Sequence, residues 1–209
     1  MKIVHIINNL DSGGAENALC KICKYDTENK HIVISLQGPG RYFKPLSKEG
    51  IKVYFLKARF YSIYKFFYLI RLLIYIKPNI VQTWLVHSDF IGGIAARLAG
   101  IKNISWNIRF SNLDIRKIKL STTIIIKILS ILSYFIPKFI IVNSKRGKKT
   151  YEYVGYDKKK LKFIPNGYDL QILKPNKFEK KSFKEKIKIK KNIPLIGNVA
   201  RYDLLKDHL

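Results

Sequence analysis

Residues 2–25 read KIVHIINNLDSGGAENALCKICKY, and this stretch decides the fold class. Lys2 to Ile7 is a short apolar run rich in β-branched residues, which indicates a buried strand. Ser12-Gly13-Gly14 then breaks the pattern, and Ala15 to Tyr25 carries apolar residues at helical spacing. The order strand, glycine turn, helix predicts the first unit of an α/β fold.

The same alternation continues to about residue 164. We predict further strands over residues 31–36, 51–56, 80–84, 101–108, 139–142 and 161–164, and helices over 62–76, 87–99, 121–135 and 144–154. The predicted strands are continuous apolar runs, as is typical of parallel strands covered on both faces. Right-handed crossovers then give a doubly wound, Rossmann-like parallel sheet, with ligands at the carboxyl ends of the strands.

The composition of the chain changes after Gly167. Residues 174–192 are rich in charge and weakly patterned, and the apolar run 193–200 follows them. We therefore predict a first domain over residues 1–173, a charged linker over 174–192, and the start of a second Rossmann-like domain over 193–209, opening with a strand.

Lys and Arg number 40 against 14 Asp and Glu, a formal net charge of +26. Such a field favours phosphorylated substrates, anionic lipid surfaces or nucleic acids. The lysines are spread along the chain, so a bias toward Lys and Ile would explain the same numbers without any partner. Residues 59–76 and 121–138 interleave aromatic and aliphatic side chains with basic ones, which suits an anionic membrane surface; ordinary packing against the sheet is the alternative.

No uncharged run reaches membrane-spanning length, and the first residues lack the pattern of a signal peptide. We expect a cytoplasmic protein that contacts the inner face of the membrane. Cys20 and Cys23 form a lone Cys-x-x-Cys without a second pair to complete a zinc site. We expect them to be small buried side chains on one helix face, and we expect no metal.

Gly13 and Gly14 open the first predicted helix directly after the first strand. Glycines let a ligand approach the backbone, and the unpaired N–H groups of a helix start favour phosphate. The segment is not Gly-x-Gly-x-x-Gly and no Walker lysine follows, which weakens dinucleotide and P-loop interpretations. A purely structural glycine turn remains the alternative.

Three further candidates follow later strands at the same predicted edge. His87 could orient an acceptor hydroxyl or bind a sugar, or it could be a helix-start histidine bonded to backbone. Asp89 could bind an acceptor or complement the helix dipole, and Arg109 could pair with a phosphate or remain an exposed loop residue. Arg201 and Lys206, after the strand at 193–200, suit two cations that converge on a diphosphate.

Taken in order, these segments resemble the retaining glycosyltransferases with two facing Rossmann-like domains, the GT-B architecture of family 4 type. The segments that carry the resemblance are residues 12–16, 83–89, 106–112, 142–144, 155–157, 164–169 and 197–201 with Lys206. The resemblance implies that the N-terminal domain binds the acceptor and that Gly13, Gly14, Arg201 and Lys206 border the donor diphosphate. It places His87 at the reaction centre and Asp89 and Arg109 on the acceptor side, with no cofactor besides the nucleotide-sugar.

The resemblance implies transfer of a hexosyl group from a nucleotide-sugar to a glycan or polyprenyl-linked acceptor in cell-envelope or capsule polysaccharide synthesis. The paired-glutamate motif of the family, which grips the donor, is missing before Leu209. We therefore expect weak donor binding by this chain alone. There are two alternatives: the chain is a non-catalytic acceptor-binding remnant, or it is half of a split enzyme that a separate chain completes. A nucleic-acid-binding protein is a third, but no motif supports it and we expect no nucleic acid partner.

Overall fold

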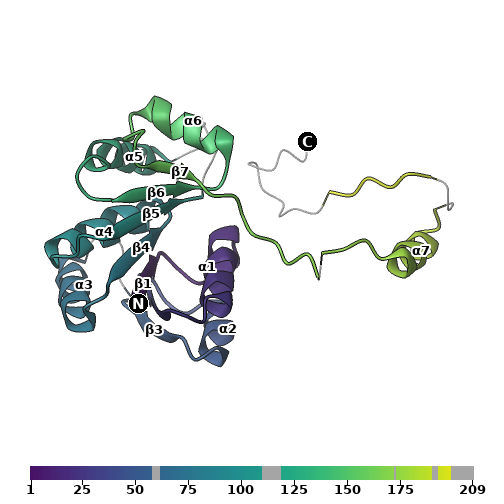
Figure 1. Ribbon diagram of the computed structural model, residues 1–209, viewed down its shortest axis with the longest axis horizontal. Helices are drawn as coiled ribbons and strands as arrows, with labels where there is room; N and C mark the ends of the chain where they lie inside the picture. Colours follow the sequence, from purple (N-terminus) through teal and green to yellow (C-terminus); the bar gives the residue numbers. More distant parts are fainter. Residues whose placement is uncertain (58–61, 110–118, 172, 190–192, 199–209) are drawn as a thin grey trace. The chain divides into compact units, whose positions relative to one another are not determined.

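The computed structural model describes residues 1–57, 62–109, 119–171, 173–189 and 193–198. Its centre is one sheet of seven parallel strands in the order β3-β2-β1-β4-β5-β6-β7 (Figure 1). The strands are β1 (Lys2–Ile7), β2 (Lys30–Ser35), β3 (Lys52–Phe55), β4 (Ile80–Trp84), β5 (Ile104–Ile108), β6 (Phe139–Val142) and β7 (Leu161–Phe163). The predicted doubly wound parallel sheet is confirmed.

Helices cover both faces of this sheet, with α1 and α2 on one side and α3, α4 and α5 on the other (Figure 1). The helices are α1 (Gly14–Tyr25), α2 (Phe43–Lys48), α3 (Ile63–Ile76), α4 (Val86–Leu98), α5 (Leu120–Leu132), α6 (Lys145–Val154) and α7 (Lys177–Lys186). Because the chain leaves β1 toward one face and β4 toward the other, the winding reverses between these two neighbouring strands.

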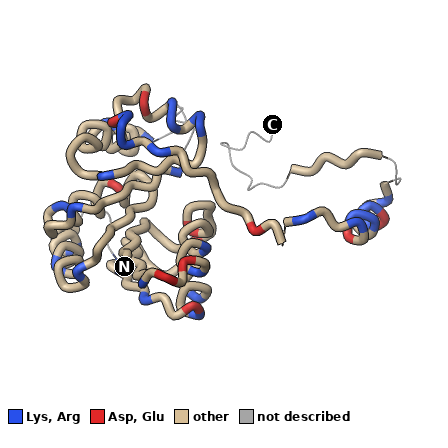
Figure 2. Tube along the Cα trace, in the orientation of Figure 1, with Lys and Arg blue, Asp and Glu red and all other residues tan. Residues whose placement is uncertain are grey.

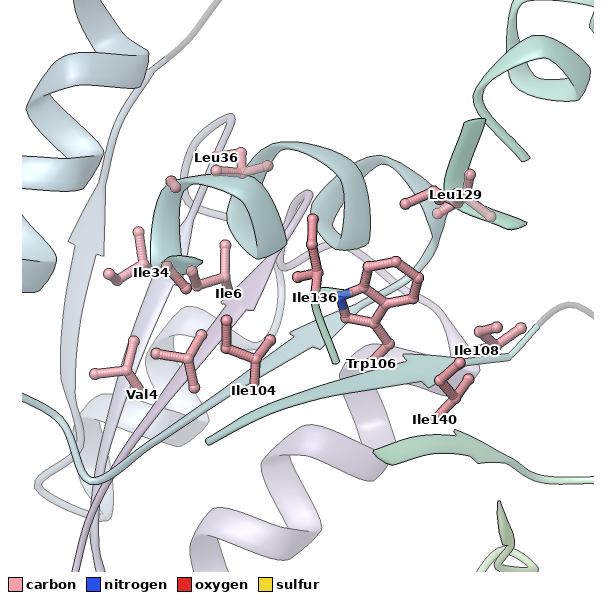
Figure 3. Packing of buried hydrophobic residues seen from close by; sticks show 14 of the residues in the cluster. Val4, Ile6, Ile34, Leu36, Ile104, Trp106, Ile108, Leu129, Ile136 and Ile140 are labelled. Carbon is pink, nitrogen blue, oxygen red and sulfur yellow. The ribbon is translucent and has the colours of Figure 1, made fainter. Parts of the chain in front are cut away.

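Strand alternation divides the core into two clusters, one on each face of the sheet. Val4 and Ile6 of β1 belong to the cluster under α3, α4 and α5, together with Trp106 of β5 (Figure 3). Ile7 belongs to the cluster under α1, together with Trp84 of β4. Successive side chains of a strand point to opposite faces, so parity along each strand decides which face a candidate functional residue reaches.

Two glycines set the position of α4 on the sheet. A Cβ added at Gly92 would lie 3.0 Å from Cγ2 of Ile6, and one added at Gly93 would lie 2.7 Å from Nε1 of Trp106. Side chains at either position would push the helix outward, because sheet residues already fill that space. The close packing fixes α4, and therefore the residues of its first turn at the carboxyl edge.

The predicted cap of α6 is present. The Ser144 hydroxyl accepts a hydrogen bond from the Gly147 N–H at 2.9 Å, and Gly155 ends the helix with a φ of 102°. We expect Ser144→Ala to lower the free energy of unfolding by about 1 kcal/mol, since one helix-start N–H loses its acceptor. Urea titration measures the loss, and Ser144→Asp, which keeps an acceptor, is the control. Equal stability of the alanine variant would contradict this role of Ser144.

The structure differs from the sequence prediction at several places. The helices α2 and α7 were not predicted, and α7 lies inside the segment expected to be a linker. The strand expected from residue 101 begins at Ile104. No strand forms within residues 193–198, the described part of the strand predicted over 193–200; a lone strand has no ladder partner for its backbone groups.

By internal contacts the chain divides into two units, Met1–Asn166 and Gly167–Leu209. The first holds the whole sheet, and the second holds α7. In the second unit the Asn176 side chain caps α7, accepting hydrogen bonds from the N–H groups of Phe178 and Glu179. The domain bounds proposed at residues 173 and 192 stay predictions.

Candidate functional site

The carboxyl ends of β1, β4 and β5 lie side by side. Ile7 of β1 pairs with Trp84 of β4, and Trp84 pairs with Asn107 of β5. The segments that follow these strands carry Gly13, His87 and Arg109, so all three candidates lie at one edge of the sheet, as the sequence predicts. This edge includes the point where the winding reverses, which is where doubly wound folds bind ligands.

Gly13 and Gly14 form the start of α1. Gly13 is the N-cap residue in an extended conformation and has no side-chain cap. A Cβ added at Gly14 meets no atom of the described residues within 4 Å, so that position is open to a ligand. At Gly13 an added Cβ would collide with the Glu16 carboxyl group. Burial raises the pKa of the Glu16 carboxyl group above its usual value.

Arg109 lies on the face of the sheet that α1 covers. Its guanidinium is 5.1 Å from the centre of the Trp84 ring, and its Nε donates to Oδ1 of Asn107 at 2.8 Å. An Nη1 hydrogen bond joins it to Oδ1 of Asn166, the last residue of the first unit. Burial lowers the pKa of Arg109 from its usual value, but an arginine remains protonated at neutral pH. Among the described residues, Arg109 is therefore a cation held in place at this edge.

His87 lies in the first turn of α4 and lines a pocket of about 310 Å³. Asn8, Gln37, Ser62 and Lys65 are further polar residues of its wall. The remainder is apolar and comes from α3, α4, α5 and the residues that follow β2 and β3, Leu36 and Leu56. Burial lowers the pKa of His87, so its imidazole is neutral at physiological pH and can accept a proton from a hydroxyl group. The apolar pocket lies on the face opposite to Arg109.

Leu85 holds a strained backbone conformation between β4 and α4. Its φ of 71° and ψ of 155° belong to a region that glycine normally occupies. Its N–H donates to the Asn107 carbonyl at 3.1 Å, and its carbonyl accepts from the Asp89 N–H at 2.9 Å. These two bonds fix the sharp turn that brings His87 to the edge. Strain of this kind is concentrated at functional sites.

Asp89 points into the core and is only 1% exposed. The Thr83 hydroxyl donates to its carboxylate at 2.6 Å, and the Asn107 backbone N–H also hydrogen-bonds it. Burial outweighs these bonds and raises the pKa of Asp89 to about 7. The side chain thus ties α4 to β4 and β5, which suits a positioning role; its assignment to acceptor binding stays a prediction.

A buried polar chain under α1 was not found by sequence reasoning. The Trp84 Nε1–H donates to Nδ1 of His5 at 3.3 Å, and Nε2 of His5 lies 2.9 Å from Nδ1 of His31. Burial lowers the pKa of His5 to about 3, with the nearby His31 adding to the effect. The His5 ring is therefore neutral, and it both accepts and donates hydrogen bonds in this chain. The alternation of side chains along each strand could have indicated part of this chain. His5 and Trp84 point to the same face of the sheet, but this follows only when the pairing of β1 with β4 is known.

The two cysteines differ in burial. Cys23 is buried among the residues under α1, and Cys20 is partly exposed. Burial raises the pKa of the Cys23 thiol to about 12, so it is a protonated thiol in the absence of a cation.

Arg201 and Lys206 lie outside the described residues, and their assignment to the donor diphosphate stays a prediction.

Basic residues are spread over the molecule. Figure 2 shows Lys and Arg on the helices of both sheet faces and on α7 rather than gathered at the site. Among the described residues, no helix combines the length and apolar character that crossing a membrane requires.

A family model described as Glycosyltransferase Family 4 matches residues 12–172. Among solved structures, Anabaena HepE (Alr3699) in complex with UDP matches with a TM-score of 0.76 and 16% identity, over 90% of this chain and 50% of that one. A glycosyltransferase from Rickettsia africae matches with a TM-score of 0.65 and 18% identity, over 92% and 51% of the two chains. The lipopolysaccharide outer core galactosyltransferase WaaB, in its apo form, matches with a TM-score of 0.60 and 16% identity, over 81% and 47%.

The chain thus spans about half the length of the solved relatives that it matches. At these identities the likeness shows the fold, which is that of one half of a GT-B structure. No curated protein matches the sequence.

Proposed function

The chain belongs to glycosyltransferase family 4, and from this premise we propose that it is the acceptor-binding half of a retaining glycosyltransferase. The reaction would transfer a hexosyl group from a nucleotide-sugar to a glycan or polyprenyl-linked acceptor in cell-envelope polysaccharide synthesis. The observation that carries the proposal is the family match over residues 12–172 together with candidate residues at one edge of the sheet. The complex of HepE with UDP supports a nucleotide-linked donor.

On the donor side, the proposed contacts are the open helix start at Gly13 and Gly14 and the cations Arg201 and Lys206. Cleavage of the bond to a diphosphate leaving group builds negative charge on its oxygens. Helix-end N–H groups and fixed cations stabilise that charge without a metal. The acceptor hydroxyl would attack from the side of the leaving group, which retains the configuration of the sugar.

On the acceptor side, His87 is the group proposed to hold or accept the proton of the attacking hydroxyl. It is neutral at physiological pH because burial lowers its pKa. Arg109, fixed by Asn107 and Trp84, is proposed to bind an anionic group of the acceptor at the same edge. Asp89 would act through the turn that carries His87, given its bonds to Thr83 and Asn107.

The apolar pocket beside His87 supports a lipid-linked acceptor. Its walls suit an isoprenoid chain better than a hydrated sugar. The exposed faces of α3 and α5 are also rich in large apolar side chains, including Tyr64, Phe67, Ile124 and Ile131. With a net charge of +26, these helices suit an anionic membrane surface. We therefore propose that the protein is cytoplasmic and binds peripherally to the inner face of the membrane.

Binding of a short-chain polyprenyl diphosphate sugar to the purified chain tests the acceptor assignment. We expect Phe66→Asp, in the pocket wall, to weaken binding on the order of tenfold or more, because a carboxylate would enter an apolar site. Tyr64→Asp is the matched control, since Tyr64 is 72% exposed on the same helix. Equal losses in both variants, or no binding by the wild-type chain, would overturn the assignment.

Sugar transfer separates the proposed transferase from its alternatives. A transferase consumes nucleotide-sugar in the presence of acceptor, whereas a non-catalytic remnant binds acceptor and transfers nothing. A split enzyme gains transfer only when a second chain supplies the donor-binding half. The last alternative rests on the half-length match to the solved relatives.

A further inference from the structure

Three side chains able to bind a metal converge under α1, away from the carboxyl edge. They are His5 of β1, His31 of β2 and Cys23 of α1, and they are 1%, 4% and 5% exposed. One ligand atom of each lies within 4.8 Å of the ligand atoms of the other two. The His5 and His31 rings of the two neighbouring strands are stacked, with ring centres 5.2 Å apart. Helix α1 places the Cys23 thiol beside these two imidazoles.

We propose that His5, Cys23 and His31 bind one Zn²⁺ ion. Imidazole nitrogen and thiolate sulfur are the ligands that zinc prefers, and three protein ligands leave a fourth position for water. Nε2 of His5 and Nδ1 of His31 face each other at 2.9 Å. A zinc ion would replace the hydrogen bond between these two nitrogens and would accept a lone pair from each of them. Zinc deprotonates a coordinating thiol, so one proton leaves Cys23 for solvent with each ion bound.

Asp26 provides the outer contact that such a site requires. Its Oδ2 lies 3.2 Å from Nε2 of His31 without the alignment of a hydrogen bond. When an ion takes the Nδ1 lone pair of His31, the ring carries its proton on Nε2, where this carboxylate is placed to accept it. The Asn29 amide in turn donates to both oxygens of Asp26, at 3.0 and 2.9 Å. The Asp26 carboxylate and the Cys23 thiolate balance the two charges of Zn²⁺. The Asp26 side chain is 31% exposed, so this outer contact lies near the surface, at the C-terminal end of α1.

Zinc binding would change the environment of Trp84. With the ion on Nε2, the neutral His5 ring carries its proton on Nδ1, which now accepts a hydrogen bond from Trp84. The two N–H groups would then oppose each other, and the Trp84 bond must break. The Gln82 side chain also hydrogen-bonds the His5 ring and offers an acceptor for that proton. Tryptophan fluorescence is therefore expected to change with metal occupancy.

Titration of the chelator-treated chain with Co²⁺, used as a spectroscopic probe for Zn²⁺, tests the proposal. We expect one Co²⁺ per chain, a near-ultraviolet thiolate-to-cobalt absorption band, and loss of the band when Zn²⁺ displaces the probe. Cys23→Ser should abolish the band. Cys20→Ser is the matched control, because Cys20 lies in the same Cys-x-x-Cys but outside the cluster. Asp26→Asn should weaken binding about 10- to 100-fold, as is usual for the outer partner of a ligating histidine.

Absence of the cobalt–thiolate band in the wild-type chain would overturn the proposal. So would a band lost equally in Cys20→Ser, since the metal would then bind a surface thiol. If Cys23→Ser does not fold, the zinc content of the wild-type chain after exposure to Zn²⁺ and gel filtration decides: one ion per chain supports the site, and none refutes it. All of these readouts are independent of sugar transfer, so they stand apart from the proposed function.

Discussion

Gly40→Ala is expected to destabilise the sheet-bearing unit and to displace the segment between β1 and α1. A Cβ at position 40 would lie 2.4 Å from the carbonyl carbon of Leu10 and 2.5 Å from the nitrogen of Asp11. Both are backbone atoms, so no side-chain rotation relieves the clash. The Tyr42 N–H also donates to the Leu10 carbonyl at 2.9 Å, which ties the two loops together. The added methyl group must therefore move residues 10 and 11, and with them the glycine turn at the start of α1.

We expect a loss of about 1–3 kcal/mol in the free energy of unfolding, the usual range for overpacking. Thermal unfolding and urea titration measure it, and faster hydrogen exchange at the Tyr42 amide would report the separated loops. Gly38→Ala is the matched control, because a Cβ at Gly38 meets nothing within 4 Å in the same loop. Equal stability of the two variants would show that Gly40 does not hold the loops at this distance.

The second large effect is a dependence of stability on pH that comes from Asp89. Burial raises the pKa of Asp89 from 3.8 to about 7 in the folded chain. Between these two values the unfolded chain has lost a proton that the folded chain still holds. Rising pH therefore favours unfolding across this window. The stabilising contribution is complete below about pH 4 and is lost as the pH rises through about 7.

A difference of about three pKa units corresponds to roughly 4 kcal/mol. About two of these three units lie between pH 5 and the folded pKa of about 7. Relative to Asp89→Asn, the wild-type chain is therefore expected to be more stable at about pH 5 than at about pH 8, by roughly 3 kcal/mol. Urea titration at both values measures the change. Asp11→Asn, at an exposed carboxyl group, is the control and should follow the wild-type curve. Parallel curves for Asp89→Asn and the wild type would mean that the Asp89 carboxyl group ionises normally.

Much of the fold could be predicted because the signals are local. The bounds of β1, β4 and β6 were predicted to the residue, and the Ser144 cap was inferred from a residue type with a known role. Helix α2 was missed because it has six residues and contains Pro45, too short for a periodic pattern. Helix α7 was missed although Asn176 and Glu179 form a recognisable helix start. The many charged residues of this segment led to its prediction as a linker, although the capping residues favoured a helix.

The sequence was enough to predict which edge of the sheet carries the candidate residues. It was not enough to predict which face of the sheet each side chain reaches. Strand order along the chain is enough to place Gly13, His87 and Arg109 together, because parallel strands share their carboxyl edge. Which face each side chain reaches depends on helix packing. Gly92 and Gly93 draw α4 onto the sheet and bury Asp89. Likewise, the meeting of His5 with His31 depends on strand register, which local pattern does not contain.

The place of β1 at the point where the winding reverses has a consequence for synthesis. As the chain emerges from the ribosome, β1, β2 and β3 can assemble first, but the other edge of β1 has no partner until β4 appears. During that interval the nascent sheet exposes the backbone of an apolar strand. The unpaired backbone N–H and C=O groups of this edge can form hydrogen bonds with other incompletely synthesised chains, which promotes aggregation. Slow translation of the region before Ile80 would prolong that exposure, and a chaperone that shields β1 would reduce the risk.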